Sequence, residues 1–365
     1  MVKKMMFNNF YNGKNVLITG HTGFKGTWLA SWLLKLGANV IGFSDQVPTK
    51  PSHFEALNLK DKIKDYRGDI RNFLDIKNVF DNEKIDILFH LAAMPIVKEC
   101  YEKPLSALTT NVIGSSNLLE CVRQDKNIIS AVFITSDKCY DNVEWNYGYR
   151  ETDRLGGKDP YSASKACAEL AYRTYFESYL KNLPVKTATA RAGNVIGGGD
   201  WAKDRIVPDC IKAWSNNESV TIRNPNATRP WQLVLEPISG YLVLGWQLIE
   251  SKLNLDGESF NFGPRAEEVR SVNALMIELR KVWQNSKYEY IEKIDEDFKE
   301  ANLLKLCCDK ALSLLNWQAT HSFSTTVLET ANWYQAFYQN DTNIWELTAD
   351  TISRFEKEFM KRQSN

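Results

Sequence analysis

Two residues four positions apart, Tyr161 and Lys165, have the types and spacing for acid–base chemistry on a hydroxyl group. On a helix, residues at i and i+4 share one face, and Pro160 suits the first position of such a helix. We expect the lysine charge to lower the pKa of the tyrosine, so that the phenolate accepts a proton while a hydride leaves the same carbon. Isolated pairs of this kind are common by chance, so the functional meaning of Tyr161 and Lys165 depends on the segments around them.

A polar group follows the apolar run at residues 131–135, which has the composition of a buried strand. It consists of Ser136, Asp137 and Lys138. Ligands of parallel sheets bind beyond the carboxyl ends of the strands, so we expect these side chains to face the same site as Tyr161. Ser136 would hydrogen-bond the reacting hydroxyl. Taken alone, Asp137 and Lys138 are more typical of a solvated turn.

A glycine-rich segment lies between the first expected strand, residues 15–19, and the first expected helix, residues 27–36. Gly20, Gly23 and Gly26 have the spacing GxxGxxG. Glycines at these positions allow a tight turn and a close approach of the backbone to a pyrophosphate, which the helix N-terminus then faces. We expect this loop to bind NAD, with further loop contacts from Thr22, Phe24 and Lys25.

The adenosine end of the dinucleotide is expected beside the following strands. Asp45 comes just after the second expected strand, residues 39–43, and would bind a ribose hydroxyl together with Ser44. No arginine adjoins Asp45 in the sequence, which favours NAD over NADP. Further cofactor contacts are expected after the third and fourth strands, at Asp69, Ile70, Leu91, Ala92 and Ala93. Asp69 could equally cap a helix, and small residues are also common in strand-to-helix packing.

Short β-branched runs alternate with helical patterns along the first 190 residues, with further strands at 85–90 and 185–190. This alternation predicts an α/β fold, a Rossmann-type doubly wound parallel sheet. After Arg191, glycines and prolines mark loops, and shorter elements follow at 220–222, 272–282 and 325–338. We expect a smaller mixed C-terminal lobe there.

Composition excludes several classes of function. Forty-five basic and 45 acidic residues balance, which gives no sign of nucleic-acid or membrane-surface binding. No apolar run reaches the ~18–20 residues of a membrane span. The seven cysteines form no CxxC pair, so neither a disulfide framework nor a metal site is predicted. Because the N-terminal residues lack a signal-peptide pattern, we expect a cytoplasmic protein.

Six segments in this order resemble the extended short-chain dehydrogenase/reductase family of nucleotide-sugar enzymes. They are GHTGFKG at 20–26, LAA at 91–93, NVIG at 111–114, TSDKCY at 135–140, YSASK at 161–165 and NVIGGGDW at 194–201. The resemblance covers nearly the whole chain. Narrower marks, including RPWQ at 229–232, are similar to CDP-glucose 4,6-dehydratases, whereas the related dTDP-glucose enzymes have Asp-Glu at 137–138.

The resemblance implies NAD-dependent dehydration of a nucleotide-activated hexose, foremost CDP-glucose, to a 4-keto-6-deoxy sugar. Tyr161 would deprotonate the C4 hydroxyl, Ser136 would polarise its oxygen, and Lys165 would hold Tyr161 and the nicotinamide ribose. Asp137 would help expel the C6 hydroxyl as water across C5–C6, with hydride returning to C6. Lys138 would be the C5 base only if burial lowers its pKa; otherwise it shapes the charge around Asp137.

The binding contacts rest partly on the resemblance as well. It adds Asn111 to the cofactor contacts. Arginine forks match phosphate oxygens, which makes Arg191 a candidate for the diphosphate. The expected substrate contacts are Met94, Asn194, Arg205, Arg223, Arg229 and Trp231, with Asn194 and Arg229 best supported by the family pattern. Surface ion pairs are the alternative for the arginines, and the hydrophobic core is the alternative for Trp201 and Trp231.

Two positions depart from the family pattern: Met94 replaces a glutamine, and Leu233 replaces a histidine. Both segments are expected to border the substrate, so the loss of two polar groups could change the sugar or nucleotide that is accepted. The alternatives are a 4-epimerase or decarboxylase of this family, a dehydratase for another nucleotide sugar, or a binding protein without turnover. Asp137 argues against simple epimerisation, and the intact redox set argues against a pure binder.

The expected organisation is an NAD-binding domain at residues 1–190, with a return segment near 231–263, and a nucleotide-sugar lobe over most of 191–365. The partners are expected to be the nucleotide sugar and a second copy of the chain. A homodimer would form through helices at 161–181 and 111–124, although their apolar residues would equally suit the core of the protein.

Overall fold

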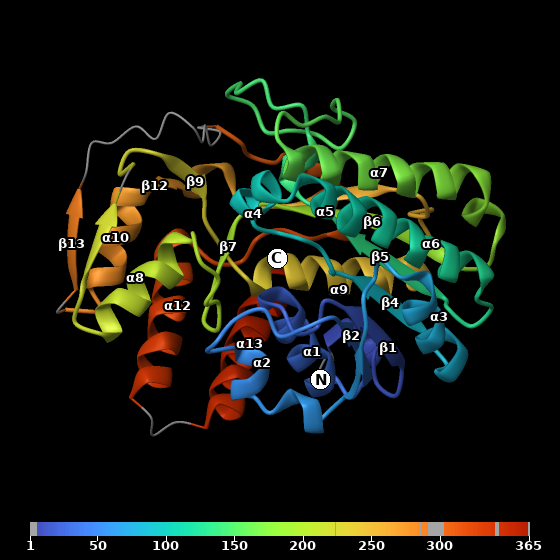
Figure 1. Ribbon diagram of the computed structural model, residues 1–365, viewed down its shortest axis with the longest axis horizontal. Coiled ribbons are helices and arrows are strands. Elements are labelled where there is room, and N and C mark those ends of the chain that lie inside the picture. The colour runs from blue at the N-terminus through green and yellow to red at the C-terminus, as the bar shows by residue number, and fades with distance from the viewer. Residues whose placement is uncertain (1–5, 223, 285, 291–302, 340–342, 364–365) are drawn as a thin grey trace.

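A seven-stranded parallel sheet forms the centre of the computed structural model (Figure 1), which describes residues 6–363 except 223, 285, 291–302 and 340–342. The strand order is β11-β6-β5-β4-β1-β2-β3. The order reverses between β1 and β4, so the sheet has the topological switch point at which such folds bind dinucleotides. The predicted Rossmann-type sheet is therefore confirmed.

Apart from the partly exposed edge strand β3, the strands of this sheet are buried on both faces. They are β1 (Asn15–Thr19), β2 (Asn39–Ser44), β3 (Lys64–Arg67), β4 (Ile87–His90), β5 (Ser130–Ile134), β6 (Lys186–Ala192) and β11 (Ser259–Phe262). Successive side chains point to opposite faces of a strand. Val16 and Ile18 accordingly belong to one hydrophobic core and Leu17 to another.

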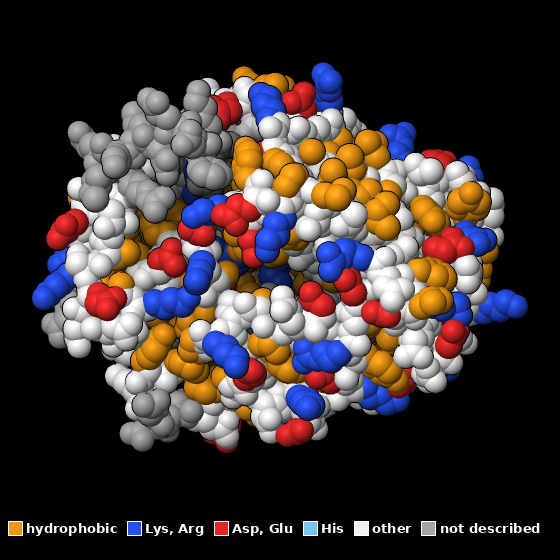
Figure 2. Space-filling model, in the orientation of Figure 1, with side chains coloured by type: hydrophobic (Ala, Val, Ile, Leu, Met, Phe, Trp, Pro, Cys, Tyr) orange, Lys and Arg blue, Asp and Glu red, His pale blue; other side chains and the backbone are white. Residues whose placement is uncertain are grey.

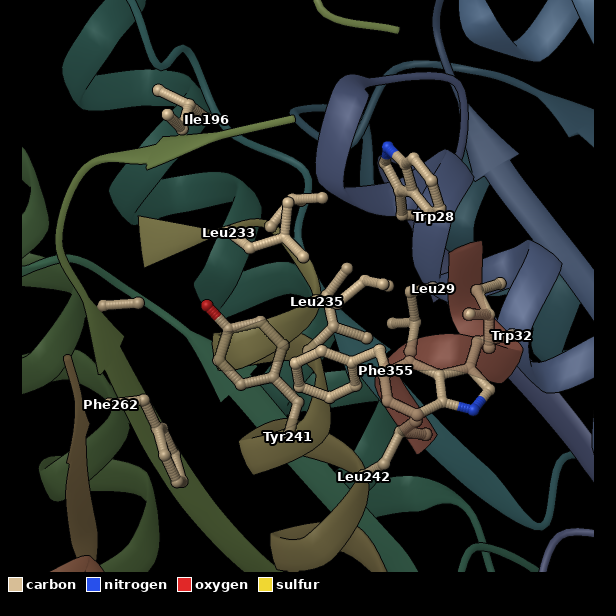
Figure 3. Close-up of a cluster of buried hydrophobic side chains, with 14 of the residues drawn as sticks. Trp28, Leu29, Trp32, Ile196, Leu233, Leu235, Tyr241, Leu242, Phe262 and Phe355 are labelled. Carbon is tan, nitrogen blue, oxygen red and sulfur yellow. The ribbon is translucent and has the colours of Figure 1, made fainter. Parts of the chain in front are cut away.

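Helices cover the two faces. The first core is built with α1 (Phe24–Lys35), α9 (Leu235–Glu250) and α13 (Ile344–Gln363), and the second with α3 (Phe73–Asn82), α6 (Gly114–Gln124) and α7 (Pro160–Ser178). Figure 3 shows how the first core joins distant segments, with Trp32 of α1 near Phe355 of α13 and Leu235 of α9. The chain thus returns twice after β6 to complete the Rossmann layers.

The smaller lobe lies at the left of Figure 1 and is mixed, as predicted. Its strand pairs are β7 (Val195–Ile196) with β10 (Gln232–Leu233), β8 (Ser219–Ile222) with β13 (Lys287–Tyr290), both parallel, and β9 (Thr228–Pro230) with β12 (Val269–Ser271), antiparallel. Its main helices are α8 (Ile206–Ser215), α10 (Val272–Arg280) and α12 (Phe323–Tyr338).

The shorter helices of the described chain as a whole are α2 (His53–Ala56), α4 (Val97–Glu102), α5 (Pro104–Leu108) and α11 (Asp309–Leu315).

Most expected elements lie within two or three residues of the observed ones. Helix α1 begins at Phe24, three residues before the expected start at 27, because Gly26 belongs to the helix. The predictions did not include α9 or α13, although both complete the first core. Within the described part of the chain, none of the helices is both long enough and apolar enough to span a membrane.

Candidate active site

The glycine loop joins β1 to α1 and packs tightly against the end of β4. Gly20 has a φ of +76°, where side chains other than glycine are strained, and a Cβ there would lie 2.7 Å from the backbone nitrogen of Ala92. A Cβ on Gly26 would lie 2.1 Å from the Gly20 carbonyl oxygen. Both glycines are therefore required by the turn itself.

The N-terminus of α1 has the properties of an anion site. Its N-cap is Gly23, which offers no capping side chain, and a Cβ on Gly23 would approach only the Gly20 oxygen, at 3.4 Å. The first N–H groups of the helix and the positive end of its dipole thus face the loop. This arrangement fits the pyrophosphate of a dinucleotide. Thr22 supports the loop by donating to the carbonyl of Gln46 at 2.7 Å, and Phe24 begins α1.

Beneath the loop, His21 is fully buried and anchors it to β2 and β3. The imidazole bonds the Asp65 carboxylate at 2.9 Å and the Ser44 hydroxyl at 3.0 Å. Ser44 also accepts a bond from the backbone nitrogen of Thr22 at 3.4 Å. Ser44 therefore holds the loop, which leaves the exposed Asp45 as the stronger candidate for the ribose hydroxyls.

Although no arginine adjoins Asp45 in the sequence, one lies near it in space. The segment after β3 brings Arg71 beside it; the bond to Asp69 raises the pKa of Arg71, and the Asp45 charge adds to that rise. Arg71 Nε lies 2.9 and 2.8 Å from the two carboxylate oxygens of Asp69. Two carboxylates thus surround one guanidinium, so this end keeps a negative charge that suits ribose hydroxyls better than an additional phosphate.

Among the other expected cofactor contacts, Ile70 is buried in the second core, and Leu91, Ala92 and Ala93 are half-buried beyond the end of β4. Asn111 lies in a π-helical turn, Thr109–Ile113, ahead of α6. Its amide bonds the backbone nitrogen of Met94 at 2.8 Å, the Met94 carbonyl at 3.2 Å and the Ser164 hydroxyl at 2.8 Å. Asn111 thereby ties the β4 loop to α7.

The structure brings the expected redox residues together. Asp159 caps α7 by accepting a bond from the nitrogen of Ser162 at 2.9 Å, which places Tyr161 and Lys165 in the first two turns. Tyr161 is 8% exposed and Lys165 is 6% exposed. A hydrogen bond joins Tyr161 to Ser136, which lies just beyond the end of β5. Side chains from one strand end and one helix start therefore share a single buried site.

Asp137 and Lys138 lie next to this group. Ser136 Oγ donates to Asp137 Oδ1 at 3.0 Å, and Lys138 Nζ lies 3.8 Å from the same oxygen. Asp137 is 4% exposed, which excludes the solvated turn that its sequence context alone would suggest. The position of the lysine charge agrees with the alternative in which Lys138 shapes the electrostatics of Asp137.

The electrostatics differ from the sequence expectation for Tyr161. Burial raises the pKa of Tyr161 to about 12; the Ser136 hydrogen bond and Arg205 oppose this, and Asp137 adds to it. The predicted lowering by Lys165 is therefore wrong in this structure, because desolvation of the phenolate dominates. Burial also lowers the pKa of Lys165 to about 8.

Lys25 belongs to the same electrostatic cluster although it lies in the first turn of α1, beside the glycine loop. Burial lowers its pKa to about 8, as do the charges of Arg205, Lys165 and Lys138, while Asp137 opposes them. Several cations thus surround one carboxylate at the junction of the loop and the strand ends. On the face shown in Figure 2, the surface is hollowed near the middle, where Lys and Arg side chains gather.

A small cavity opens beside Asp137. It is lined by Asp137, Gly193, Pro230, Arg265, Lys305 and Leu306, among others. A Cβ on Gly193 would lie 3.1 Å from Asp137 Oδ2, so the glycine leaves room beside the carboxylate. The sequence predictions missed Arg265 and Lys305. The position of Arg265 just beyond the carboxyl end of β11 was the available signal.

The expected substrate residues are placed unevenly. Arg205 pairs with Asp200 at 2.8 Å and lies close enough to lower the pKa of Tyr161. Arg229 lies on β9, which continues into the cavity wall at Pro230, and Asn194 lies between β6 and β7. Arg223 lies outside the described residues.

The apolar candidates separate into site and core. Met94 packs in a small cluster with Tyr161 and therefore borders the site. Leu233 is 3% exposed and belongs to the first core (Figure 3), a position that favours packing over contact with the substrate. Trp231 is 5% exposed and its indole N–H donates to the Arg270 carbonyl at 3.0 Å, which favours the core alternative.

Arg191 is not available to a diphosphate. Its guanidinium is 3% exposed and bonds both oxygens of Glu169, at 2.9 Å from Nε and 2.8 Å from Nη2. The side chain of this β6 residue points toward α7 rather than toward the cavity. The sequence predictions missed Glu169, although it follows Lys165 by one helical turn.

Comparisons with known proteins agree with this geometry. Residues 17–330 match the GDP-mannose 4,6 dehydratase family. The CDP-glucose 4,6-dehydratase of Salmonella typhimurium is 43% identical over 92% of this chain and 95% of that protein, and human dTDP-D-glucose 4,6-dehydratase is 24% identical over 91% and 93%.

Solved structures show the same fold. The UDP-glucose 4-epimerase of Thermotoga maritima has a TM-score of 0.74 at 23% identity and covers 88% of this chain and 98% of its own. The dTDP-glucose 4,6-dehydratase of Bacillus anthracis, solved in complex with NAD, has a TM-score of 0.73 at 21% identity and covers 90% and 98%. The resemblance stated from the sequence is confirmed: the chain belongs to the GDP-mannose 4,6-dehydratase family.

Proposed function

We propose that this protein is an NAD-dependent nucleotide-sugar 4,6-dehydratase that converts CDP-glucose to CDP-4-keto-6-deoxyglucose. One observation carries the proposal: the buried carboxylate of Asp137 lies beside Ser136 at the strand end that meets Tyr161. Oxidation at C4 needs only the tyrosine–lysine pair, whereas loss of water also needs an acid for the leaving hydroxyl. The relative at 43% identity supports CDP-glucose as the substrate.

The residues of the chain have distinct roles in this reaction. Bound NAD supplies the acceptor for the C4 hydride and the donor that returns it to C6. Tyr161 takes the C4 hydroxyl proton, and Ser136 holds the same oxygen through its hydroxyl. Arg205 places positive charge near the phenolate, whose formation burial opposes, and Lys165 would hold Tyr161 and the nicotinamide ribose.

Water loss follows from the acidity of the C5 proton next to the C4 ketone. The Asp137 carboxylate accepts the C5 proton and passes it to the departing C6 hydroxyl, so that water leaves and the carboxylate is regenerated. Lys138, 3.8 Å from it, stabilises that carboxylate. Burial of the whole group keeps solvent from quenching the intermediate. The glycine loop, Asp45 and Lys25 hold the cofactor, while Arg205, Arg229 and Asn194 hold the nucleotide diphosphate.

A panel of nucleotide sugars tests this function. The protein is incubated with NAD and, separately, CDP-, dTDP-, UDP- and GDP-linked hexoses, and the products are weighed by mass spectrometry. We expect a product lighter by one water from CDP-glucose, with the other nucleotides converted more slowly. An unchanged mass with inverted C4 would instead identify an epimerase, and loss of carbon dioxide from UDP-glucuronic acid would identify a decarboxylase.

The protein is further proposed to act as a homodimer. Apolar side chains gather on the outer face over α5 and α7 in Figure 2, and the exposed ones include Leu105, Ile113 and Leu170. A monomer rarely leaves a contiguous apolar patch in water, so a second copy would cover it. Light scattering should give twice the chain mass, and Leu170→Glu should give the single chain; a monomeric parent protein would contradict the assignment.

The proposed division of labour assigns residues 1–190, with the return at 231–263, to NAD and most of 191–365 to the nucleotide sugar. We place the protein in the cytoplasm, where its seven unpaired cysteines would stay reduced. Its product would be an intermediate for deoxysugar biosynthesis, since a 4-keto group invites reduction or group transfer in a following step.

A further inference from the structure

Glu169 lies one helical turn after Lys165, on the same face of α7. It is 3% exposed, and its carboxylate is fully hydrogen-bonded. Arg191 donates to Oε1 at 2.9 Å and to Oε2 at 2.8 Å, Thr189 donates to Oε2 at 3.0 Å, and Thr135 donates to Oε1. A carboxylate saturated in this way is fixed in both position and charge.

The bonds of Glu169 and Arg191 reach both ends of the catalytic turn. Thr135 immediately precedes Ser136 in the chain. At the other end, Arg191 Nη1 donates to the Tyr140 hydroxyl at 2.8 Å, and that hydroxyl donates to Asn261 at 2.8 Å. The network therefore joins the helix that bears Tyr161 to the residues before and after Ser136, Asp137 and Lys138.

Stability alone is a weak explanation for this pair. A buried ion pair contributes little net stability compared with well-packed apolar residues, because both charges lose their hydration. Its position next to Lys165 gives it another use. We propose that Glu169 is a positioning residue of the proposed dehydratase: its buried charge, anchored by Arg191, keeps Lys165 cationic and fixes α7 against the catalytic turn.

The surroundings of Lys165 support this role. The titratable groups coupled to it are Glu169, Cys139, Cys100, Lys25 and His90. Burial raises the pKa of both thiols and lowers that of His90 to about 3, so these three groups are uncharged at neutral pH. Among the described groups that shift the pKa of Lys165, Glu169 is therefore the one that carries a negative charge at neutral pH.

Glu169 keeps its negative charge at neutral pH. Although burial raises the pKa of Glu169, the charge and hydrogen bonds of Arg191 and the threonine bonds hold it below its usual value. Burial lowers the pKa of Lys165 to about 8, and Glu169 is the strongest influence that opposes this. Without that charge, the lysine would lose its proton at a lower pH.

Two variants separate charge from architecture. Glu169→Gln removes the anion and keeps the side-chain shape, whereas Arg191→Lys keeps both charges and breaks the guanidinium fork. The alkaline limb of kcat/KM for CDP-glucose should move to lower pH by roughly one unit or more in Glu169→Gln and stay in place in Arg191→Lys. Both variants should lose thermal stability. Glu169 is not among the charges that shift the pKa of Lys25. Lys25 should therefore titrate in the same way in the parent protein and in both variants.

NADH binding, followed by fluorescence, gives a second readout that needs no sugar. It should weaken on the alkaline side, at lower pH in Glu169→Gln than in the parent protein and in Arg191→Lys. If Glu169→Gln does not fold, Glu169→Gln/Arg191→Met, which leaves no unpaired guanidinium, should show the same displacement. The proposal would be overturned if Glu169→Gln left the alkaline limbs of both pH profiles, kcat/KM and NADH binding, where they are in the parent protein. It would also be overturned if Arg191→Lys moved them as far as Glu169→Gln does. A parent protein that binds NADH but does not dehydrate CDP-glucose would contradict the proposed function alone.

Discussion

The two sides of the site differ in how their side chains are held. On the catalytic side, Ser136, Tyr161 and Lys165 are buried at the end of β5 and the start of α7, and the Glu169–Arg191 network fixes those two elements together. On the substrate side, Arg205 is one-third exposed and pairs with Asp200 in its own loop. The proposed assignment therefore puts bond breaking on buried side chains at the end of β5 and the start of α7, and recognition on side chains that pair within their own loops.

The largest expected effect on activity comes from a change on the catalytic side. Tyr161→Phe removes the proton acceptor and leaves the ring in place, so kcat should fall by roughly 10²–10⁴-fold. Binding of CDP-glucose, measured by calorimetry, should change little because the phenyl ring still fills the site. Retained turnover would exclude Tyr161 as the acid–base residue and remove the main contrast between the two sides.

Asp137→Asn should separate the steps of the reaction. Asparagine keeps the size and the hydrogen bond to Ser136 but cannot protonate the leaving C6 hydroxyl, so dehydration should fall about 10²-fold or more while oxidation at C4 persists. In a single turnover followed by absorbance, the cofactor should then still be reduced while formation of the dehydrated product is slow. If both steps fall equally, Asp137 acts in the oxidation or in folding rather than in water loss.

The substrate side should respond mainly in KM. Arg205→Met and Arg229→Met each remove a candidate phosphate contact, so KM for CDP-glucose should rise about tenfold or more, as for the loss of a hydrogen bond to a charged group. Arg205→Met should in addition lower kcat, because the Arg205 charge also lowers the pKa of Tyr161. Arg270→Met, opposite Arg229 on β12, is the matched control and should leave KM unchanged. Kinetic constants for the three variants check this, and a fall in kcat with constant KM would place these arginines on the catalytic side.

The smallest effect is expected at the adenosine end. Asp45→Asn should weaken NAD binding by only about fivefold, the loss of one hydrogen bond at an exposed position. Arg71→Met should leave NAD affinity nearly unchanged because Asp69 already holds that guanidinium. Calorimetric titration with NAD and NADP measures both variants. Stronger loss of NAD in Arg71→Met than in Asp45→Asn would assign the ribose contact to the arginine.

The sequence predicted the sheet and the redox residues because local rules determine them. Strand periodicity, the glycine spacing and the four-residue step from Tyr161 to Lys165 each act over one turn or one strand. The sequence could not show that the Arg191 side chain pairs with Glu169 or that Leu233 is buried in the first core, because these depend on contacts between distant segments. The same limit hid Arg71 beside Asp45 and Lys305 beside Asp137.

The most direct measurement follows the hydride itself. CDP-glucose that carries deuterium at C4 is incubated with the protein and NAD, and the product is examined by NMR. If Tyr161 begins an oxidation that Asp137 turns into dehydration, the deuterium should be found at C6 of a 4-keto-6-deoxy sugar. Deuterium recovered at C4 of an inverted sugar, with no loss of water, would contradict that reaction.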